Sequence, residues 1–136
     1  MSDQVSAAEA ALVARDQERQ PWKQAFVLLL AGSPSYSEVA ALIEERIAYT
    51  PRFRQIVEGW PMPRWVDDQG FHVHGHLKEY RLAAGERLQD WLSARLVTGF
   101  DRSHPLWDAW LVSSVAPGLS ALVVFSHPAL VDGYDH

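Results

Sequence analysis

A histidine and a carboxylate lie close together near the end of the 136-residue chain, in the segment HPALVDG at 127–133. The imidazole of His127 can accept a proton near neutral pH, because the pKa of histidine lies in that range. Asp132 can orient a loop, and Gly133 allows a close approach of the backbone. Pro128 has no side-chain group that accepts a proton and no backbone N–H. The segment therefore has the residue types of an acid–base site, except at one position.

Three histidines at alternate positions form a second candidate site, His72, His74 and His76 in the segment FHVHGHLKEYRL at 71–82. On an extended strand these alternate residues share one face, and imidazoles are common zinc ligands. The alternative is a surface strand that is rich in histidine and binds no metal. Because no other ligand cluster accompanies the three residues, we expect no metal site here.

The first half of the chain predicts a strand and a helix. The apolar run AFVLLLAG at 25–32 is typical of a strand that is buried on both faces. Residues 35–49 repeat apolar side chains at helical spacing, and Ser35 and Glu38 have the spacing of a capping box. An Ala-rich segment at 6–20 is also compatible with a helix.

The remaining patterns complete an α-β-α-β-α-β-β order. The many prolines of 60–68 argue against a helix or an inner strand, whereas the alternation in 71–82 favours a strand. Apolar spacing predicts a further helix at about 86–97. Two strand-like runs at 107–115 and 119–126 are joined by Ala-Pro-Gly, which predicts a hairpin with the candidate acid–base segment at its exit.

Composition limits the functions that are possible. Hydrophobic residues make up 48% and charged residues 21%, as expected for one globular domain, with residues 1–5 disordered. A net charge of −5 argues against binding to nucleic acid, and the absence of cysteine excludes disulfides and thiolate zinc sites. The longest apolar run is too short for a transmembrane helix. We expect a cytoplasmic protein, with peripheral contact to a membrane or lipid surface left open.

Four blocks in a fixed order carry a resemblance to a known family. They are residues 25–55, residues 63–82, residues 100–112 with the Pro-Leu-Trp sequence, and HPALVDG. With these blocks the chain resembles the bacterial wax ester synthase/diacylglycerol acyltransferase family. That family is part of the chloramphenicol-acetyltransferase-like superfamily, which also includes the condensation domains of peptide synthetases.

The resemblance implies a fold and a reaction. The expected fold is α/β, a mixed sheet with flanking helices, and residues 1–136 would be a partial N-terminal acyltransferase-like domain. Members of the family transfer fatty acyl groups from acyl-CoA, a co-substrate, to a long-chain alcohol or diacylglycerol, and no bound cofactor is implied.

The family's motif is His-His-x-x-x-Asp-Gly, in which the second histidine is the general base. The position of that base is Pro128 in this chain. His127 matches the first histidine, which has a supporting place in the family. Asp132 matches the structural aspartate, and Gly133 matches the glycine. We expect His127 to be packed in the core, because adjacent residues of an extended segment point to opposite faces. The alternative is that His127 acts as a displaced base.

The substituted base and the short length predict a truncated or split family member that is inactive alone. Two alternatives are an active subunit that a second polypeptide completes, and a non-catalytic module that binds lipid or a protein partner. In each case we expect the chain to associate with itself or with a complementary polypeptide. Residues 121–125 and 107–112 are the ones we expect to be left uncovered.

We predict that the three alternate histidines hold no structural metal. Metal analysis of the purified chain after dialysis should find no stoichiometric zinc. A stoichiometric zinc content that is lost in His74→Ala would contradict this expectation.

Overall fold

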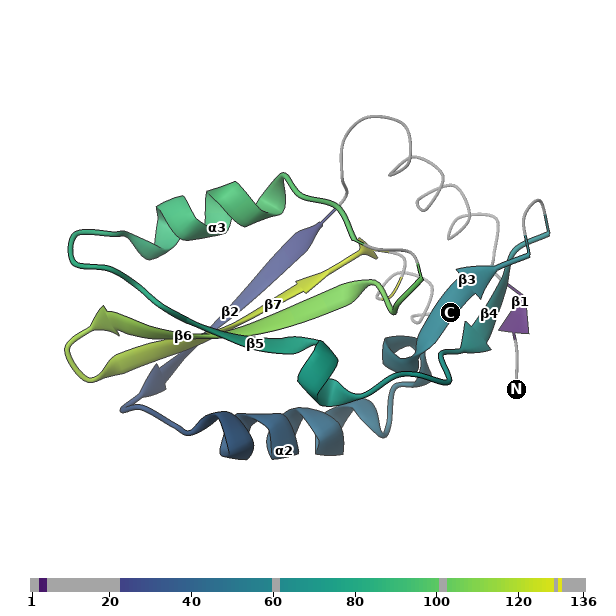
Figure 1. Ribbon diagram of the computed structural model, residues 1–136, viewed down its shortest axis with the longest axis horizontal. Coiled ribbons are helices and arrows are strands. Elements are labelled where there is room, and N and C mark those ends of the chain that lie inside the picture. The colour runs from purple at the N-terminus through teal and green to yellow at the C-terminus, as the bar shows by residue number, and fades with distance from the viewer. Residues whose placement is uncertain (1–2, 5–22, 60–61, 101–102, 129, 131–136) are drawn as a thin grey trace.

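The computed structural model describes residues 3–4, 23–59, 62–100, 103–128 and 130, which form two sheets with flanking helices (Figure 1). The elements in chain order are β1 (Asp3–Gln4), β2 (Gln24–Ala31), α2 (Tyr36–Ile47), β3 (Gln55–Glu58), β4 (Arg64–Asp67), β5 (Leu77–Arg81), α3 (Leu88–Leu96), β6 (Trp107–Ala116) and β7 (Leu119–Ser126). Short 3₁₀ turns lie at Pro51–Arg54 and Val73–Gly75. The expected α/β class with a mixed sheet and flanking helices is confirmed.

The larger sheet has the strand order β2-β7-β6-β5, in which β5 is parallel to β6 and the other neighbours are antiparallel. The predicted hairpin of β6 and β7 is its centre. A tight turn at Pro117 and Gly118 joins the two strands, and Gly118 has a φ of 69°, which favours glycine. A register shift between Val112 and Ala116 places Ser114 in the left-handed region as well, at a φ of 62°.

One helix covers each face of the larger sheet, and Figure 1 shows α3 above it and α2 below it. The cluster under α2 contains side chains of β5, β6 and β7 such as Leu77, Ala109 and Leu122. The opposite face packs Val123 and Phe125 against Trp91 of α3. Because side chains alternate along β7, this strand contributes residues to the apolar clusters on both faces of the sheet. No helix among the described residues is both long and apolar enough to cross a membrane.

The burial of two segments differs from the sequence-based expectation. We expected 25–32 to be buried on both faces, but β2 is an edge strand of the larger sheet, and its residues 26–29 are exposed. We expected 121–125 and 107–112 to be uncovered, but these strands pair in the centre of the sheet under both helices. An apolar run indicates that both faces of a strand are suited to burial. It does not indicate whether another element covers them.

Three smaller expectations were also wrong. Residues 64–67 form β4, the inner strand of the smaller sheet, because the prolines stop at Pro63 and leave every β4 amide available for pairing. The segment 71–82 contains a 3₁₀ turn at Val73–Gly75 and forms a strand only over Leu77–Arg81. Asp3 and Gln4, which we expected to be disordered, pair with Trp65 and Arg64 through backbone contacts that need no apolar side chains. The helix predicted at 6–20 lies outside the described residues.

The beginning of α2 confirms that Ser35 caps this helix. The backbone N–H of Glu38 donates to the Ser35 hydroxyl at 3.2 Å, and that hydroxyl lies 3.1 Å from the Glu38 carboxylate. This arrangement satisfies one of the amides that have no partner inside the first helical turn. The apolar stripe of α2 then begins at Val39 and faces the sheet.

We predict that Ser35→Ala lowers the free energy of unfolding by about 1 kcal/mol, because an alanine leaves that amide without its acceptor. Urea unfolding measures the change. Ser37→Ala, at an exposed position in the first turn of the same helix, is the matched control and should have a smaller effect. Equal losses in the two variants would contradict the capping role.

Candidate functional site

His127 lies directly after β7 and is completely buried, with 0% of its surface exposed. Its backbone N–H donates to the carbonyl oxygen of Leu106 at 2.9 Å, so the pairing between β6 and β7 continues past the end of β7. This burial agrees with the interpretation of His127 as a packed core residue.

Pro128 follows at the beginning of a helical turn. Pro128 and Leu130 have helical backbone, and the N–H of Leu130 donates to the His127 carbonyl at 3.0 Å. Proline is well suited to a first helical position, because the amide there has no partner inside the helix and the ring already fixes φ. Pro128 is buried, and Leu130 lies in the apolar cluster under α2. Asp132 and Gly133 lie outside the described residues.

The Pro-Leu-Trp segment at the beginning of β6 connects the candidate sites. The Leu106 carbonyl accepts from His127, and the Trp107 carbonyl lies 2.7 Å from Nδ1 of His76. The Trp107 indole N–H donates to the carbonyl of Phe53 at 2.8 Å. Phe53 lies in the 3₁₀ turn before β3, so this bond also connects the smaller sheet to Trp107. Both Leu106 and Trp107 are buried. Sequence reasoning missed this connection, although the position of the block directly before a predicted inner strand is a signal that could have suggested it.

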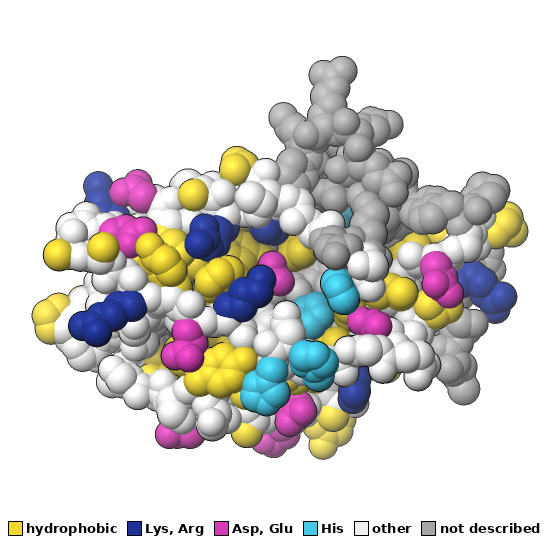
Figure 2. All heavy atoms as spheres, viewed as in Figure 1, with side chains coloured by type: hydrophobic (Ala, Val, Ile, Leu, Met, Phe, Trp, Pro, Cys, Tyr) yellow, Lys and Arg dark blue, Asp and Glu magenta, His cyan; other side chains and the backbone are white. Residues whose placement is uncertain are grey.

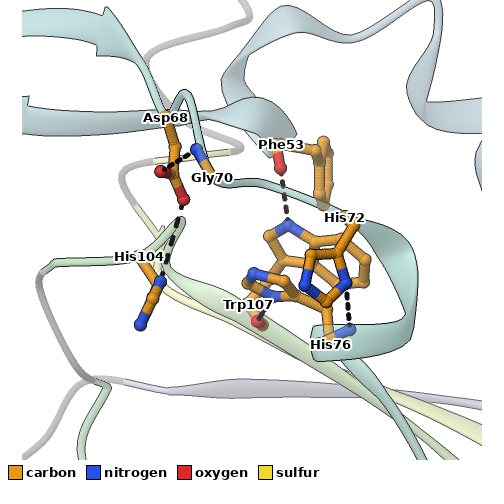
Figure 3. Close-up of polar contacts among 8 residues, drawn as sticks. Phe53, Asp68, Gly70, His72, His76, His104 and Trp107 are labelled. Atoms are coloured by element: carbon orange, nitrogen blue, oxygen red, sulfur yellow. Dashed lines mark hydrogen bonds and ion pairs between the residues drawn. The ribbon is translucent and has the colours of Figure 1, made fainter.

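His76 is the buried imidazole beside this segment, and Figure 3 shows it against Trp107. A carbonyl oxygen only accepts, so Nδ1 of His76 carries the proton and Nε2 keeps a lone pair. The ring stacks on Trp107 with centroids 4.7 Å apart and contacts Phe71 at 5.1 Å. Burial lowers the pKa of His76, and the Trp107 carbonyl and the Asp108 carboxylate oppose this shift less strongly.

The other histidines of the predicted triplet have separate partners. His72 accepts from the Gly75 N–H at 3.1 Å, whereas His74 contacts the Tyr36 hydroxyl at 3.2 Å. The 3₁₀ turn at Val73–Gly75 breaks the alternation that would place all three on one face. Histidine side chains still gather on the face seen in Figure 2. However, no group of three or more candidate metal ligands occurs among the described residues.

A cavity of about 440 Å³ lies beside His76. Its lining includes Asp68, Phe71, His104 and Trp107, and Nδ1 of His104 lies 3.7 Å from the Asp68 carboxylate (Figure 3). Oδ1 of Asp68 accepts from the Gly70 N–H at 3.1 Å. The structure thus brings His76 and His104 together, and places His127 on the other side of β6.

Residues 5–135 match the model of the wax ester synthase/diacylglycerol acyltransferase catalytic domain. The chain belongs to this family. A probable diacylglycerol O-acyltransferase of Mycobacterium tuberculosis is 28% identical over 143 residues, which cover 98% of the chain and 53% of that relative. A second M. tuberculosis relative is 31% identical over 112 residues, which cover 77% of the chain and 23% of the relative. The chain therefore spans about half the length or less of these wax ester synthase/diacylglycerol acyltransferase relatives.

Solved structures confirm the fold. The wax ester synthase/diacylglycerol acyltransferase of Marinobacter aquaeolei superposes with a TM-score of 0.76 at 21% identity, over 98% of the chain and 34% of that protein. The starter condensation domain of rhizomide synthetase RzmA superposes with a TM-score of 0.80 at 18% identity, over 98% of the chain and 35% of that domain. The expected acyltransferase-like fold is thus confirmed for a part of the family's domain.

We predict that the free energy of unfolding of this acyltransferase-family chain decreases as the pH is lowered, because of His76. The folded protein keeps the imidazole neutral, whereas the unfolded chain binds a proton as the pH falls through the ordinary pKa of 6.5. The stabilising contribution is therefore complete above that value and is lost progressively as the pH falls towards and through the lowered folded-state pKa.

The test is urea unfolding at about pH 7.5 and about pH 5, comparing the chain with His76→Asn, which keeps a donor near Nδ1 but does not titrate. The variant should lose part of the pH dependence. His72→Asn, at an exposed turn position, is the control and should keep it. The same pH dependence in all three proteins would contradict the assignment.

Proposed function

We propose that the chain supplies the HPALVDG-bearing part of an O-acyltransferase that transfers a fatty acyl group from acyl-CoA to a long-chain alcohol or diacylglycerol. Membership of the wax ester synthase/diacylglycerol acyltransferase family supports this proposal. The acyl donor is supported by a fold neighbour, a variant of the rhizomide synthetase starter condensation domain that was solved in complex with C8-CoA. Residues 1–136 then form a partial N-terminal domain.

The reaction needs a proton acceptor. The hydroxyl oxygen of the acceptor attacks the thioester carbonyl carbon, the new C–O bond forms, and the C–S bond breaks. A base removes the hydroxyl proton during the attack, and the CoA sulfur that leaves takes up a proton. Loss of a positioned base generally lowers the rate by about a hundredfold to ten-thousandfold.

Our proposal that the chain alone is inactive rests on the presence of Pro128. It occupies the position of the family's base and has no group that accepts a proton. His127 is a poor substitute, because it is completely buried and its backbone is held against Leu106. We therefore assign His127 a supporting position, and Asp132 and Gly133 the shape of the loop.

The apolar surface of β2 favours one alternative, an acyltransferase that becomes complete with further polypeptide. Phe26, Leu28 and Leu29 are each more than half exposed on an edge strand. Natural proteins rarely leave such a strand uncovered. A module that binds lipid or a protein without catalysis would use the same surface. Because acyl-CoA dissolves in water and the acceptor dissolves in lipid, we propose a cytoplasmic protein that meets a lipid surface peripherally.

We predict that the purified chain releases no CoA from palmitoyl-CoA above a buffer control in the presence of hexadecanol or diacylglycerol. A thiol reagent such as DTNB detects released CoA directly, because the chain contains no cysteine. Pro128→His alone should not restore turnover, since the rest of the domain is still required.

The control variant is His127→Ala. CoA release by the isolated chain that disappears in His127→Ala would identify His127 as a displaced base and would refute the proposal of an inactive chain. Release that persists in that variant points to a contaminant, which a mock purification identifies.

A further inference from the structure

The two edge strands of the larger sheet differ in how they are protected against pairing with another chain. β5 carries Lys78, Glu79 and Arg81, all exposed, and charged side chains discourage pairing at a sheet edge. β2 has the sequence QAFVLLLA, without a charged residue, a proline or a shift in its register with β7. Among the described residues, β2 pairs with β7 alone, and its apolar residues 26–29 are exposed. The unprotected edge of the sheet is therefore β2.

The hydrogen bonds of the neighbouring strands identify which residues of β2 face this edge. The His127 N–H donates to Leu106, which directly precedes β6, so odd-numbered residues of β7 face β6 and even-numbered ones face β2. The register joins these to even-numbered residues of β2. The Gly32 N–H, which donates to the Gly118 carbonyl at 2.7 Å, continues the same alternation. The N–H and C=O groups that point to the open edge are therefore those of Ala25, Val27, Leu29 and Ala31.

One twofold arrangement pairs all four of these residues with the same residues of a second copy. An axis perpendicular to the sheet places the two β2 strands antiparallel and keeps equivalent faces on the same side. With the axis at Leu28, Val27 pairs with Leu29 of the second copy, and Ala25 pairs with Ala31. An axis at Val27 or at Leu29 leaves one of the four without a partner. The open edge of β2 is thus complementary to itself in a single register.

We propose that β2 is the interface of a homodimer, in which two larger sheets of four strands each join into one sheet of eight. The self-complementary register favours a second copy as the partner. The charges are compatible with it as well. Residues 24–31 carry no charge, and Lys23 falls opposite Ser33 of the second copy, so no like charges meet along the strands. The inference goes beyond the proposed function, because it concerns how the chain itself covers β2.

The side chains of β2 form apolar pairs across this interface. Leu28 lines a groove with Leu42 of α2, so the even-numbered side chains of β2 lie on the face of α2. There Leu28 lies opposite Leu28 of the second copy, and Phe26 lies opposite Leu30. Apolar cross-strand pairs of this kind stabilise antiparallel sheets. An edge of eight residues is nevertheless a small interface, so we expect a dissociation constant on the order of micromolar.

The first test is the oligomeric state of the chain. Sedimentation velocity between about 1 and 300 µM should show a monomer that becomes a dimer as the concentration rises. Val27→Pro removes an N–H that faces the open edge and leaves the bonds to β7 in place, so it should weaken dimerisation at least about tenfold. Val27→Thr has nearly the same shape and keeps the N–H, and it should dimerise like the unchanged chain. Urea unfolding verifies that both variants are folded.

Cysteine cross-linking then locates the twofold axis, since the chain itself contains no cysteine. Leu28→Cys places two thiols opposite each other in a non-hydrogen-bonded pair, where Cα atoms about 4.5 Å apart are within the range of a disulfide. Mild oxidation should convert this variant to a covalent dimer. In Phe26→Cys, on the same face, the two thiols are four residues apart along the strands, about 13 Å, and should not cross-link. Mixing Phe26→Cys with Leu30→Cys should restore cross-linking.

Three results would overturn the proposal. A chain that remains monomeric up to about 300 µM does not use β2 as a stable interface. Dimerisation that Val27→Pro leaves unchanged places the interface elsewhere on the chain. Equal cross-linking of Leu28→Cys and Phe26→Cys shows contacts that do not have this register. Neither measurement involves turnover, so a failure here is distinct from a failure to detect acyl transfer.

Discussion

The hydrogen bonds of Leu106 and Trp107 hold the histidine-bearing segments at one end of the larger sheet. The Leu106 carbonyl binds the amide of His127 after β7, and the Trp107 carbonyl binds the ring of His76 before β5. Because β6 is an inner strand, these contacts are buried and shielded from water, where unpaired backbone groups would be costly. The position of His127 therefore depends on the pairing of β6 with β7 and on the apolar faces that bury that pair.

The same pairing explains why β2 differs from its neighbours. β7 has a strand on each side and a helix over each face, so six of its eight residues are buried. β2 has β7 on one side and lies at the edge of the sheet, and its residues 26–29 are exposed on both faces. The apolar sequence of β2 is thus suited to an environment that the described residues do not complete.

The sequence predicted well the elements whose signals are local. The helix predicted at 35–49 is observed at 36–47 with its capping serine, and the hairpin ends within one residue of the predicted positions. Errors occurred where tertiary contacts decide the outcome. Burial of β2 depends on a partner, and the alternation of three histidines failed because a turn at Val73–Gly75 redirects the chain. At the candidate site, the burial of His127 was predictable, whereas its hydrogen bond to Leu106 depends on the register between two strands.

In the function that we propose, Pro128 has opposite consequences for folding and for catalysis. At the first position of a helical turn, proline removes an amide that has no partner within the helix, and its ring restricts the unfolded chain. A compatible proline generally stabilises a fold by up to about 1 kcal/mol. Loss of a general base, by contrast, raises the barrier to acyl transfer by about 3–5 kcal/mol, since each tenfold in rate is about 1.4 kcal/mol. In the function that we propose, the substitution would therefore be neutral or favourable for the fold and severe for proton transfer. The proposed loss of the base is thus compatible with the acyltransferase-like fold of the chain.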